Sequence, residues 1–367
     1  MFKIKNIETY IIQVPLLVPL KMSGVHIEHC DNTVVKITAD NGKVGWGEAP
    51  YAPFFNGETS RGMVAAIDFM KDRLQGKEIL QQSDIKDVIS STIYGNSGAK
   101  SAIDMALYDL FGKSEDKPLY ETLGGAKRDK VPMIWLVAGG DDEFKLLAEK
   151  VDQGFVSFKV KVGTNNVHED IERSYQAQRI LDHNYTLSAD ANQGFNRSDA
   201  LIFASKTGDI GLDFFEQPVT GKDINTMVEC NARSYAPIGV DEGIHNIDDI
   251  KIHHDRKAAN GGSLKMIKFG GVAQLFEAAN LMHSYDMHIN LAGKAANTSI
   301  GSAAIAHFTR ALPSLDWDAS LSSQYLSDDI AENPVKVIEG HIITPDDGPG
   351  LGINIDEDKL NQYSIKL

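Results

Sequence analysis

The spacing of strand-like runs along the second half of the chain is the feature that most restricts its fold. These runs end at a series of residues separated by steps of 29, 26, 25, 24, 26 and 25: Lys161, Asp190, Glu216, Asp241, Lys265, Leu291 and Asp316. A step of this length accommodates one strand, one helix and two loops. With the run "MIWLV" before them, the runs number eight and end at "SLDWD". The sequence therefore predicts an α/β fold with a closed parallel barrel.

The regions on either side of the repeat predict the rest of the domain organisation. Residues 1–125 begin with strand-like runs that turn at Asn41-Gly42, a strong hairpin signal, and continue as helical patterns. This order indicates a small α+β domain. Residues 126–325 hold the barrel. Residues 326–367 return to Gly, Pro and strand-like residues, and we expect this segment to pack back on the N-terminal domain.

Composition and charge exclude several classes of protein. Hydrophobic residues make up 42% and charged residues 24%, values typical of soluble proteins. The formal net charge of −15 argues against nucleic acid or an anionic membrane as the main partner. Cys30 and Cys230 lie far apart and predict a reduced, cytoplasmic protein without a disulfide framework. Gln13, Pro15 and Pro19 interrupt the early apolar run, so we expect neither a signal peptide nor a membrane span.

Three acids end three consecutive predicted strands: Asp190 in "LSADANQ", Glu216 in "FFEQP" and Asp241 in "IGVDEG". Each alone also fits a structural role, as a helix N-cap, a strand end before proline or a first-turn acid. In a parallel barrel, however, the carboxyl ends of the strands meet at one mouth. Three uncompensated carboxylates would repel one another there, by several kcal/mol. A hard divalent cation would relieve that repulsion, and an all-oxygen set suits Mg²⁺ or Mn²⁺.

Lysines flank these acids on the neighbouring strands. In "SFKVKVG", alternation places Lys159 and Lys161 on one strand face. On an edge strand that face would be solvated, whereas in a barrel it points toward the mouth. Lys265 ends the strand beyond the acids, on the opposite flank. A lysine beside a cation and a second ammonium is shifted toward its neutral form and can act as a general base. The predicted chemistry is removal of a proton next to a carboxylate, with a metal stabilising the enediolate.

Five motifs in this order, "KVKVG", "ADANQGF", "EQP", "VDEG" and "LKMIKFGGV", resemble the enolase superfamily in its mandelate racemase and muconate-lactonizing-enzyme subgroup. The resemblance spans nearly the whole chain. It implies a modified TIM barrel of seven βα units plus an eighth strand, an N-terminal α+β capping domain, a small carboxylate substrate and a homo-oligomer. It implies that Lys161 and Lys265 are the acid–base catalysts. It also implies that Asp190, Glu216 and Asp241 are the Mg²⁺ ligands, with Lys159, Lys268 and Asn192 as supporting residues.

Substrate-binding residues are expected in the capping-domain loops and at the end of the eighth strand. The loops "KMSGVHIEHC" and "APYAPFFNGET" resemble lids, and Tyr51 and Phe54 are candidates either to line the pocket or to pack in the lid. In "SLDWDAS", alternation would direct Asp316 and Asp318 toward a substrate ammonium, with Trp317 adding a cation–π contact if the backbone turns. The alternative is that Trp317 packs against the outer helices and the acids are solvated.

The reaction and substrate remain open at the sequence level. Lys294 in "LAGKAANTS" would bind a second anionic group or pair with Asp316 or Asp318. The motifs favour a racemase or epimerase of an amino-acid derivative, such as a dipeptide, an N-substituted amino acid or a proline-type compound. The alternatives are a dehydratase of a hydroxy acid such as cis-3-hydroxyproline, a muconate-type cycloisomerase, and a barrel that binds ligands without catalysis.

Overall fold

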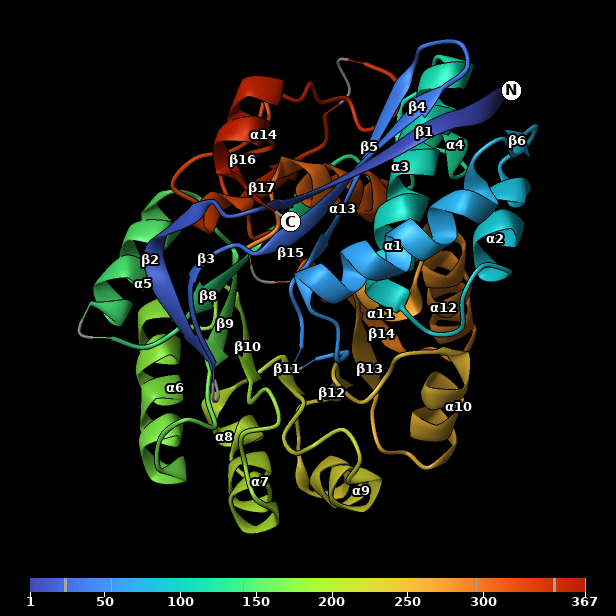
Figure 1. The fold of residues 1–367 in the computed structure, drawn as a ribbon. Helices are drawn as coiled ribbons and strands as arrows, with labels where there is room; N and C mark the ends of the chain where they lie inside the picture. Colours follow the sequence, from blue (N-terminus) through green and yellow to red (C-terminus); the bar gives the residue numbers. More distant parts are fainter. Residues whose placement is uncertain (23–24, 54, 141, 295, 346–347, 367) are drawn as a thin grey trace.

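The computed structural model describes residues 1–22, 25–53, 55–140, 142–294, 296–345 and 348–366, with the backbone alone considered for residues 18–22 and 25–27. Two units are visible in Figure 1: a twisted sheet packed with helices, built from the first part of the chain, and a barrel of strands surrounded by helices. No helix in these ranges is long and apolar enough to cross a membrane.

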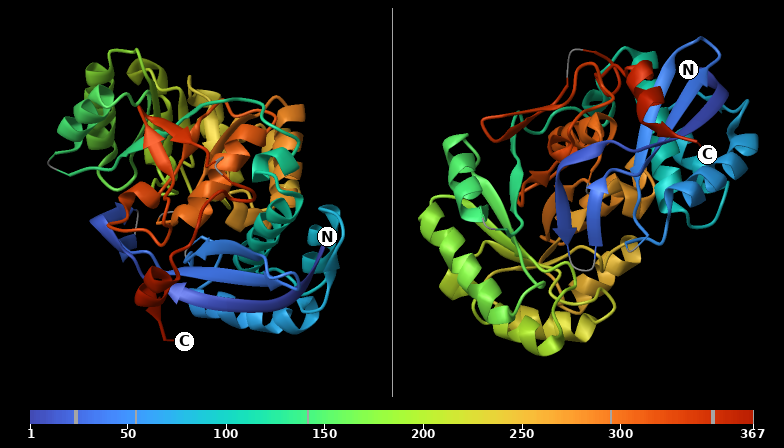
Figure 2. Two further views of the ribbon diagram at one scale, coloured as in Figure 1. Left: turned by 90° about the horizontal axis from the view of Figure 1, so that it is seen from above. Right: turned by 60° about the vertical axis from the view of Figure 1, so that its left-hand side comes forward.

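An antiparallel sheet forms the N-terminal unit. Its strands are ordered β18-β1-β4-β5, with β6 paired to β1. Their bounds are β1 Phe2–Ile12, β4 Asn32–Ala39, β5 Val44–Pro50, β6 Glu78–Ile79 and β18 Ser364–Ile365. β4 and β5 pair as a hairpin around Asn41-Gly42, as predicted, and Gly42 has the left-handed φ of +82° that this turn requires. A separate ribbon of β2 (Pro15–Met22) and β3 (Val25–His29) extends from this unit (Figure 2).

Four helices complete the unit: α1 Ser60–Leu74, α2 Ser83–Ser90, α3 Ser97–Glu115 and α4 Leu119–Thr122. α3 lies directly on β5, and the close approach depends on Gly47. A Cβ atom at Gly47 would lie 1.9 Å from the carbonyl oxygen of Ala102 in α3. Because any larger residue would push the helix away from the sheet, this glycine fixes how closely α3 packs.

The second unit is a parallel barrel, which confirms the predicted fold class. Its eight strands follow chain order around the sheet: β8 Ile134–Val137, β9 Ser157–Lys161, β10 Thr186–Asp190, β11 Phe214–Glu216, β12 Ile238–Val240, β13 Gly261–Leu264, β14 His288–Ala292 and β15 Ala319–Ser320. A single parallel bridge between Met133 and Ala319 brings the first strand against the last. The ring is therefore nearly closed, and its strands end at a common mouth.

Helices follow the first seven strands, so seven βα units precede the eighth strand. They are α5 Glu143–Asp152, α6 Val167–Leu181, α7 Arg197–Ala204, α8 Thr207–Ile210, α9 Ile224–Arg233, α10 Ile247–Asp255, α11 Met266–Phe269, α12 Val272–Ser284 and α13 Ser299–Ala311. Figures 1 and 2 show this outer ring of helices around the strands. A 3₁₀ turn, η1 Ser323–Tyr325, follows β15 and lies beside β2.

Two of the eight strands differ from their predicted positions. The sixth ends at Leu264, and Lys265 is the N-cap residue of α11 rather than part of a longer strand. The eighth comprises Ala319–Ser320 and begins only after "SLDWD". Asp318 has a φ of +51°, so an extended strand cannot continue through it. The interval that placed a strand end at Asp316 is therefore coincidental.

The C-terminal segment returns to both units. β16 (Lys336–Ile338) and β17 (His341–Ile343) form a small sheet with β7 (Val131–Pro132), just before the barrel. α14 (Glu357–Tyr363) follows, and β18 then pairs with the end of β1. The last strand thereby extends the sheet of the N-terminal unit, which ties the two ends of the chain together.

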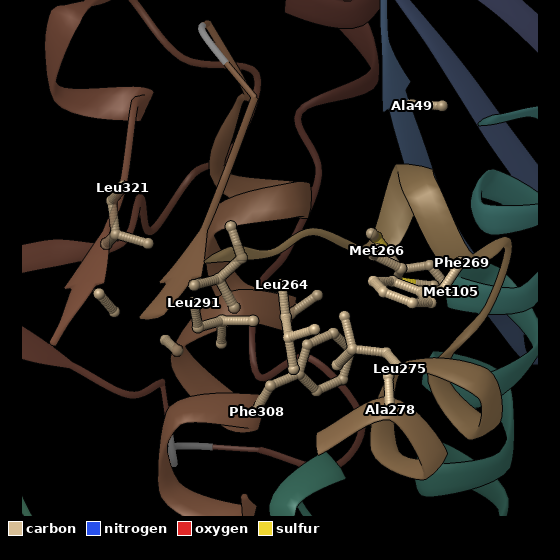
Figure 3. Close-up of a cluster of buried hydrophobic side chains, with 14 of the residues drawn as sticks. Ala49, Met105, Leu264, Met266, Phe269, Leu275, Ala278, Leu291, Phe308 and Leu321 are labelled. Carbon is tan, nitrogen blue, oxygen red and sulfur yellow. The ribbon is translucent and has the colours of Figure 1, made fainter. Parts of the chain in front are cut away.

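Apolar and polar contacts join the N-terminal unit to the barrel. Figure 3 shows Met105 of α3 beside Met266 and Phe269 of α11. Next to this cluster, the buried Asp104 of α3 accepts a hydrogen bond at 2.7 Å from the backbone N–H of Val272, the first residue of α12. Barrel helices are thus packed and capped by residues of the other unit.

A second buried carboxylate joins the units beside the barrel mouth. Glu48 of β5 accepts hydrogen bonds from the backbone N–H groups of Thr298, at 2.9 Å, and Gly301, at 2.8 Å, at the start of α13. Negative charge is favourable at a helix N-terminus, and each of these N–H groups otherwise lacks an intrahelical partner. Glu48 therefore fixes the β14–α13 loop relative to the N-terminal sheet.

Candidate active site

A cavity at the mouth of the barrel collects most of the predicted site residues. Its charged lining consists of four lysines and four acids: Lys159, Lys161, Lys265 and Lys294, with Asp190, Glu216, Asp241 and Glu242. Phe55 enters the lining from the N-terminal unit, and Leu321, Ser322 and Tyr325 close it beyond β15. The strand face with two lysines thus faces the interior of the barrel, not solvent.

Strand register explains why these side chains meet. Lys161 of β9 pairs with Asp190 of β10, and Asp190 pairs with Glu216 of β11, so three functional groups end neighbouring strands at one level. Glu216 pairs with Gly239 of β12, and Asp241 follows that strand. The regular barrel geometry therefore brings residues 25 to 29 positions apart into one layer.

Each of the three predicted metal ligands contacts a lysine. Lys161 Nζ lies 2.6 Å from Asp190 Oδ2 and also donates to Asn192 Oδ1 at 2.8 Å. Lys159 donates to Glu216, and Lys265 donates to Asp241. The lysines thus compensate directly the three carboxylates that the sequence predicted to be uncompensated.

Lys268 supports Asp241 from behind the cavity. Its fully buried ammonium lies 3.0 Å from Asp241 Oδ1 and donates to the backbone carbonyl of Asp241 at 2.8 Å. Burial lowers the pKa of Lys268, although the charge of Asp241 acts in the opposite direction. On Asp241 itself, the attraction of Lys265 and Lys268 outweighs burial and holds the pKa well below its ordinary range. The two lysines therefore favour the ionised form of Asp241.

Carboxylate contacts also set the pKa of the two proposed bases. Burial disfavours the charged form of Lys161, but attraction to Asp190 and Glu216 outweighs it and raises the pKa. Lys265 behaves in the same way, because Asp241 and Glu242 outweigh its burial. The direction is opposite to the shift predicted for Lys161, since the nearest charges are carboxylates and not cations. Any change that draws a carboxylate away from its lysine would lower that pKa.

Polar residues that the sequence did not single out position Glu216. Ser263 of β13 donates to Glu216, and its hydroxyl lies 2.9 Å from Asn290 Oδ1 of β14. Both are buried within the barrel.

Next to the acids, Asn192 and Gln217 have φ values of +41° and +38°. Such left-handed backbone in residues other than glycine is strained and is concentrated at functional sites.

Glu242, which directly follows Asp241, is a further acid of the cavity. Its Oε1 accepts a hydrogen bond at 3.1 Å from Asn192 Nδ2, and its Oε2 has no hydrogen-bond partner among the described residues. Burial, followed by the charges of Asp241 and Asp190, raises the pKa of Glu242 to about 7. The dipeptide Asp241-Glu242 in "VDEG" was the available signal.

The lid residues are only partly as expected. Phe55 lines the cavity, and its ring centroid lies 4.9 Å from the Nζ of Lys265. Tyr51 is 41% exposed and is not among the residues that line the described cavity. Phe54 and the tip of the "KMSGVHIEHC" loop lie outside the described residues.

The predicted contacts from "SLDWDAS" are wrong, because these residues lie at the opposite end of the barrel. Asp316 contacts His288, the first residue of β14, and Asp318 bonds to Ser157, the first residue of β9. Both strands begin there, so neither acid reaches the mouth. Lys294 does line the cavity, which also excludes its predicted pairing with these acids.

Trp317 closes the barrel floor and does not bind substrate or pack outside. Its ring stacks on Phe214 at a centroid distance of 4.2 Å and on His288 at 5.0 Å. Gly239 and Gly261 leave room for it, since a Cβ on Gly261 would lie 2.7 Å from the ring. Lys159 Nζ lies 5.1 Å from the Phe214 ring, so the stack supports the lysine layer from below.

Comparison with known proteins identifies the family. Residues 6–124 match the model of the mandelate racemase / muconate lactonizing enzyme N-terminal domain, and residues 143–359 match the enolase C-terminal domain-like model. The chain belongs to the enolase superfamily. Within it, the N-terminal match places the chain in the mandelate racemase and muconate lactonizing enzyme subgroup, as the five motifs indicated. It is therefore an isomerase of this superfamily, whose members here include racemases, epimerases and cycloisomerases.

Several members of this superfamily resemble the whole chain. It is 31% identical to the L-Ala-D/L-Glu epimerase of Bacillus subtilis over 96% of both chains. It is 28% identical to the N-succinyl-L-Arg/Lys racemase of Bacillus cereus, over 99% of this chain and 98% of the relative. The muconate lactonizing enzyme of Pseudomonas fluorescens, solved with muconolactone, superposes with a TM-score of 0.94 at 28% identity, covering 99% and 100% of the two chains.

Family members bind magnesium. A dipeptide epimerase from Cytophaga hutchinsonii was solved with Mg and D-Ala-L-Val, and it superposes with a TM-score of 0.92 at 24% identity, over 99% of this chain and 98% of that one. In the described part of this chain, no three acidic, histidine or cysteine side chains are close enough to bind one ion as they are placed. Glu216, Asp190 and Asp241 are paired instead with lysine ammonium groups.

Proposed function

We propose that the protein removes the proton α to a carboxylate and returns it to the opposite face, as a racemase or epimerase of an amino-acid derivative. The supporting observation is the placement of Lys161 and Lys265 across one cavity. Lys161 ends β9 and Lys265 directly follows β13, and three strands separate β9 from β13, so the two lysines lie half-way around a ring of eight. A substrate carbon between them would have one lysine on each face, and inversion needs an acid and a base so arranged.

The carboxylates between these lysines fit a divalent cation by their chemistry. Asp190, Glu216 and Asp241 offer only oxygen donors, which Mg²⁺ and Mn²⁺ prefer, and all three line the cavity. Their present spacing is set by lysine side chains, whose four-carbon stems can rotate. When bound there, such an ion would polarise the substrate carboxylate and stabilise the negative charge of an enediolate. These three residues would hold it.

The remaining assignments describe what each side chain does. Lys161 or Lys265 would take the α-proton, and the other would donate a proton to the opposite face. Movement of Asp190 and Asp241 toward a cation would weaken their hold on these lysines and lower the lysine pKa, as a base requires. Lys159, Lys268 and Asn192 would keep the carboxylates in position through the contacts described above.

A muconate-type cycloisomerase is the second candidate. The end of the cavity beyond β15 presents Ser320, Leu321, Ser322 and Tyr325, with no carboxylate to bind a substrate amine. This wall therefore suits a substrate without a free ammonium group, such as muconate or an N-acylated amino acid. The same enediolate chemistry serves both reactions, so the fate of the intermediate distinguishes them.

Incubation with Mg²⁺ in D₂O separates these functions. The substrates would be a panel of N-acyl amino acids, dipeptides, hydroxyproline derivatives and cis,cis-muconate, with NMR and chiral chromatography as readouts. We expect deuterium at the α-carbon together with inversion for an N-acyl amino acid or dipeptide. A lactone from muconate would establish the cycloisomerase instead, and a keto acid, or the cyclic imine from a hydroxyproline, would establish a dehydratase. No α-proton exchange and no product across the panel would contradict the proposal.

A further inference from the structure

Lys294 is the only lysine of the described cavity lining whose ammonium has no carboxylate partner. It follows β14 by two residues, on the loop that leads to α13. Lys159, Lys161 and Lys265 each form an ion pair. Within the described residues, Lys294 Nζ forms neither an ion pair nor a hydrogen bond, and it lies 5.5 Å from the centroid of the Phe55 ring.

The surroundings of Lys294 make an unpaired ammonium costly. Phe55 covers it together with Lys265 and Lys268, whose Nζ atoms lie 4.9 and 5.9 Å from the same ring centroid. Burial, and then repulsion from Lys265, lowers the pKa of Lys294 to about 8. An aromatic ring recovers only part of the lost hydration of a cation. An anion beside Lys294 would recover more, because it would supply a charge-assisted hydrogen bond.

No acid of the cavity takes this role. Glu242 attracts Lys294 through its charge but forms no ion pair with it within the described residues, and its Oε1 accepts a hydrogen bond from Asn192. Asp316 and Asp318, the other candidates from the sequence, lie at the barrel floor. The β14–α13 loop is also held in place by Glu48 at Thr298 and by a hydrogen bond of 2.8 Å from Ser322 Oγ to the carbonyl of Lys294. The ammonium is therefore presented by an anchored loop.

The charge balance of the cavity points in the same direction. Four lysines and four carboxylates line it, so with all eight groups charged a bound divalent cation leaves two positive charges in excess. One substrate carboxylate would compensate only one of them. Because charge left uncompensated in a low-dielectric cavity is unfavourable, a substrate with two anionic groups fits better than one with a single carboxylate.

We propose that Lys294 binds a second anionic group, so that the substrate of this enzyme is a dianion without a free ammonium. This inference rests on the proposed function, and it specifies the substrate class. Two classes share this chemistry: amino acids N-acylated by a dicarboxylic acid, and muconate-type dicarboxylates. With the α-carbon between Lys161 and Lys265, one carboxylate would lie at the three acids, and the other would reach the strand-seven side of the cavity at Lys294.

A matched pair of ligands tests the proposal by binding. N-succinyl-L-alanine and N-succinamoyl-L-alanine have nearly the same shape and differ by one charge. With the Mg²⁺-loaded protein, calorimetry is expected to show at least tenfold tighter binding of the succinyl compound. Lys294→Met should reduce this ratio to about one, and Lys294→Arg should retain most of it. Lys257→Met, far from the cavity at the other end of the barrel, is the matched control and should keep the wild-type ratio.

Kinetics separate the two substrate classes and the two proposals. The same loss of preference should appear in kcat/KM for α-proton exchange of the succinyl compound, or in KM for cis,cis-muconate if that is the class turned over. Equal binding of the pair by the wild type would overturn the role of Lys294. An equal loss of affinity for both ligands in Lys294→Met would also overturn this role, because it would indicate a general role of Lys294 in the site. A charge preference without proton exchange or muconate turnover would retain the inference and contradict the proposed function alone.

Discussion

Asp190 and its two neighbouring acids are held by lysines in the structure and would be shared with a cation in the proposed enzyme. Asp190→Asn keeps the size of the side chain and removes its charge. We expect the affinity for Mn²⁺ and Mg²⁺, measured by equilibrium dialysis, to fall by at least about 10–100-fold, the loss typical for a disturbed metal site. Asp213→Asn, at the opposite end of the barrel beside Leu187, should leave metal affinity unchanged. An unaltered affinity of Asp190→Asn would contradict the three-carboxylate site.

Trp317 has a structural role that can be separated from substrate binding. Because its ring is 7% exposed and stacked between Phe214 and His288, Trp317→Ala should remove buried area and leave a cavity in the barrel floor. We expect the free energy of unfolding, from urea titration, to decrease by about 3–5 kcal/mol. Tyr235→Ala, at a residue that is 91% exposed, should change it by less than about 0.5 kcal/mol. Equal stability of the two variants would show that the floor stack contributes little.

The sequence predicted the polar residues of the mouth more completely than their contacts. Asp190, Glu216 and Lys161 end strands, and Asp241 and Lys265 directly follow them, so their positions could be estimated from spacing. The pairing of each acid with a lysine depends on barrel curvature and side-chain length, which no local pattern encodes. Ser263 was not recognised for the same reason, since a serine in a buried strand has no distinctive signal until its partner Glu216 is known.

At the scale of helices and strands, the alternation of side chains and the interval between strands were sufficient to place the regular strands. β9, β10 and β14 have five residues each and clear patterns, so their ends could be placed. β15 has two residues, and the left-handed φ of Asp318 precedes it. Neither alternation nor spacing can identify so short a strand. The error moved Asp316 and Trp317 from the floor to the mouth, and with them the predicted ammonium site.

The contact between β5 and α3 yields a prediction at the same scale. Gly47→Ala would place a methyl group 1.9 Å from the Ala102 carbonyl oxygen, where backbone must move. We expect the free energy of unfolding to decrease by about 1–3 kcal/mol or more, as for other overpacked interiors. Gly348→Ala adds a methyl group with no heavy atom within 4 Å and should cost less than about 0.5 kcal/mol. Urea unfolding of both variants checks this, and comparable stabilities would contradict the close packing.

For the whole molecule, the buried Asp104 makes the stability of the contact between the two units dependent on pH. Its Oδ1 caps α12, while its Oδ2 has no hydrogen-bond partner among the described residues. Burial raises its pKa from 3.8 to about 7. Because the folded state retains a proton that the unfolded state has lost between these values, the stability contribution of this group falls as pH rises from about 4 to about 7.

Asp104→Asn should remove that dependence, because an amide can still accept the Val272 N–H bond without carrying charge. Relative to the wild type, we expect little change at pH 4 and a gain at pH 8 of up to about 4 kcal/mol in the free energy of unfolding. Asp68→Asn, an exposed residue of α1, should show the same difference from the wild type at both pH values. A pH-independent effect of Asp104→Asn would show that the carboxyl group is ionised throughout.

The central claim is that two lysines from opposite sides of the barrel exchange one proton of the substrate. Measurement of α-proton exchange and inversion in D₂O for Lys161→Ala and Lys265→Ala, with each enantiomer of a substrate turned over by the wild type, tests it most directly. We expect both variants to lose inversion by about 10²–10⁴-fold or more. Each should retain exchange with the enantiomer whose proton faces the remaining lysine, in a reciprocal pattern. Wild-type inversion in either variant would contradict the account.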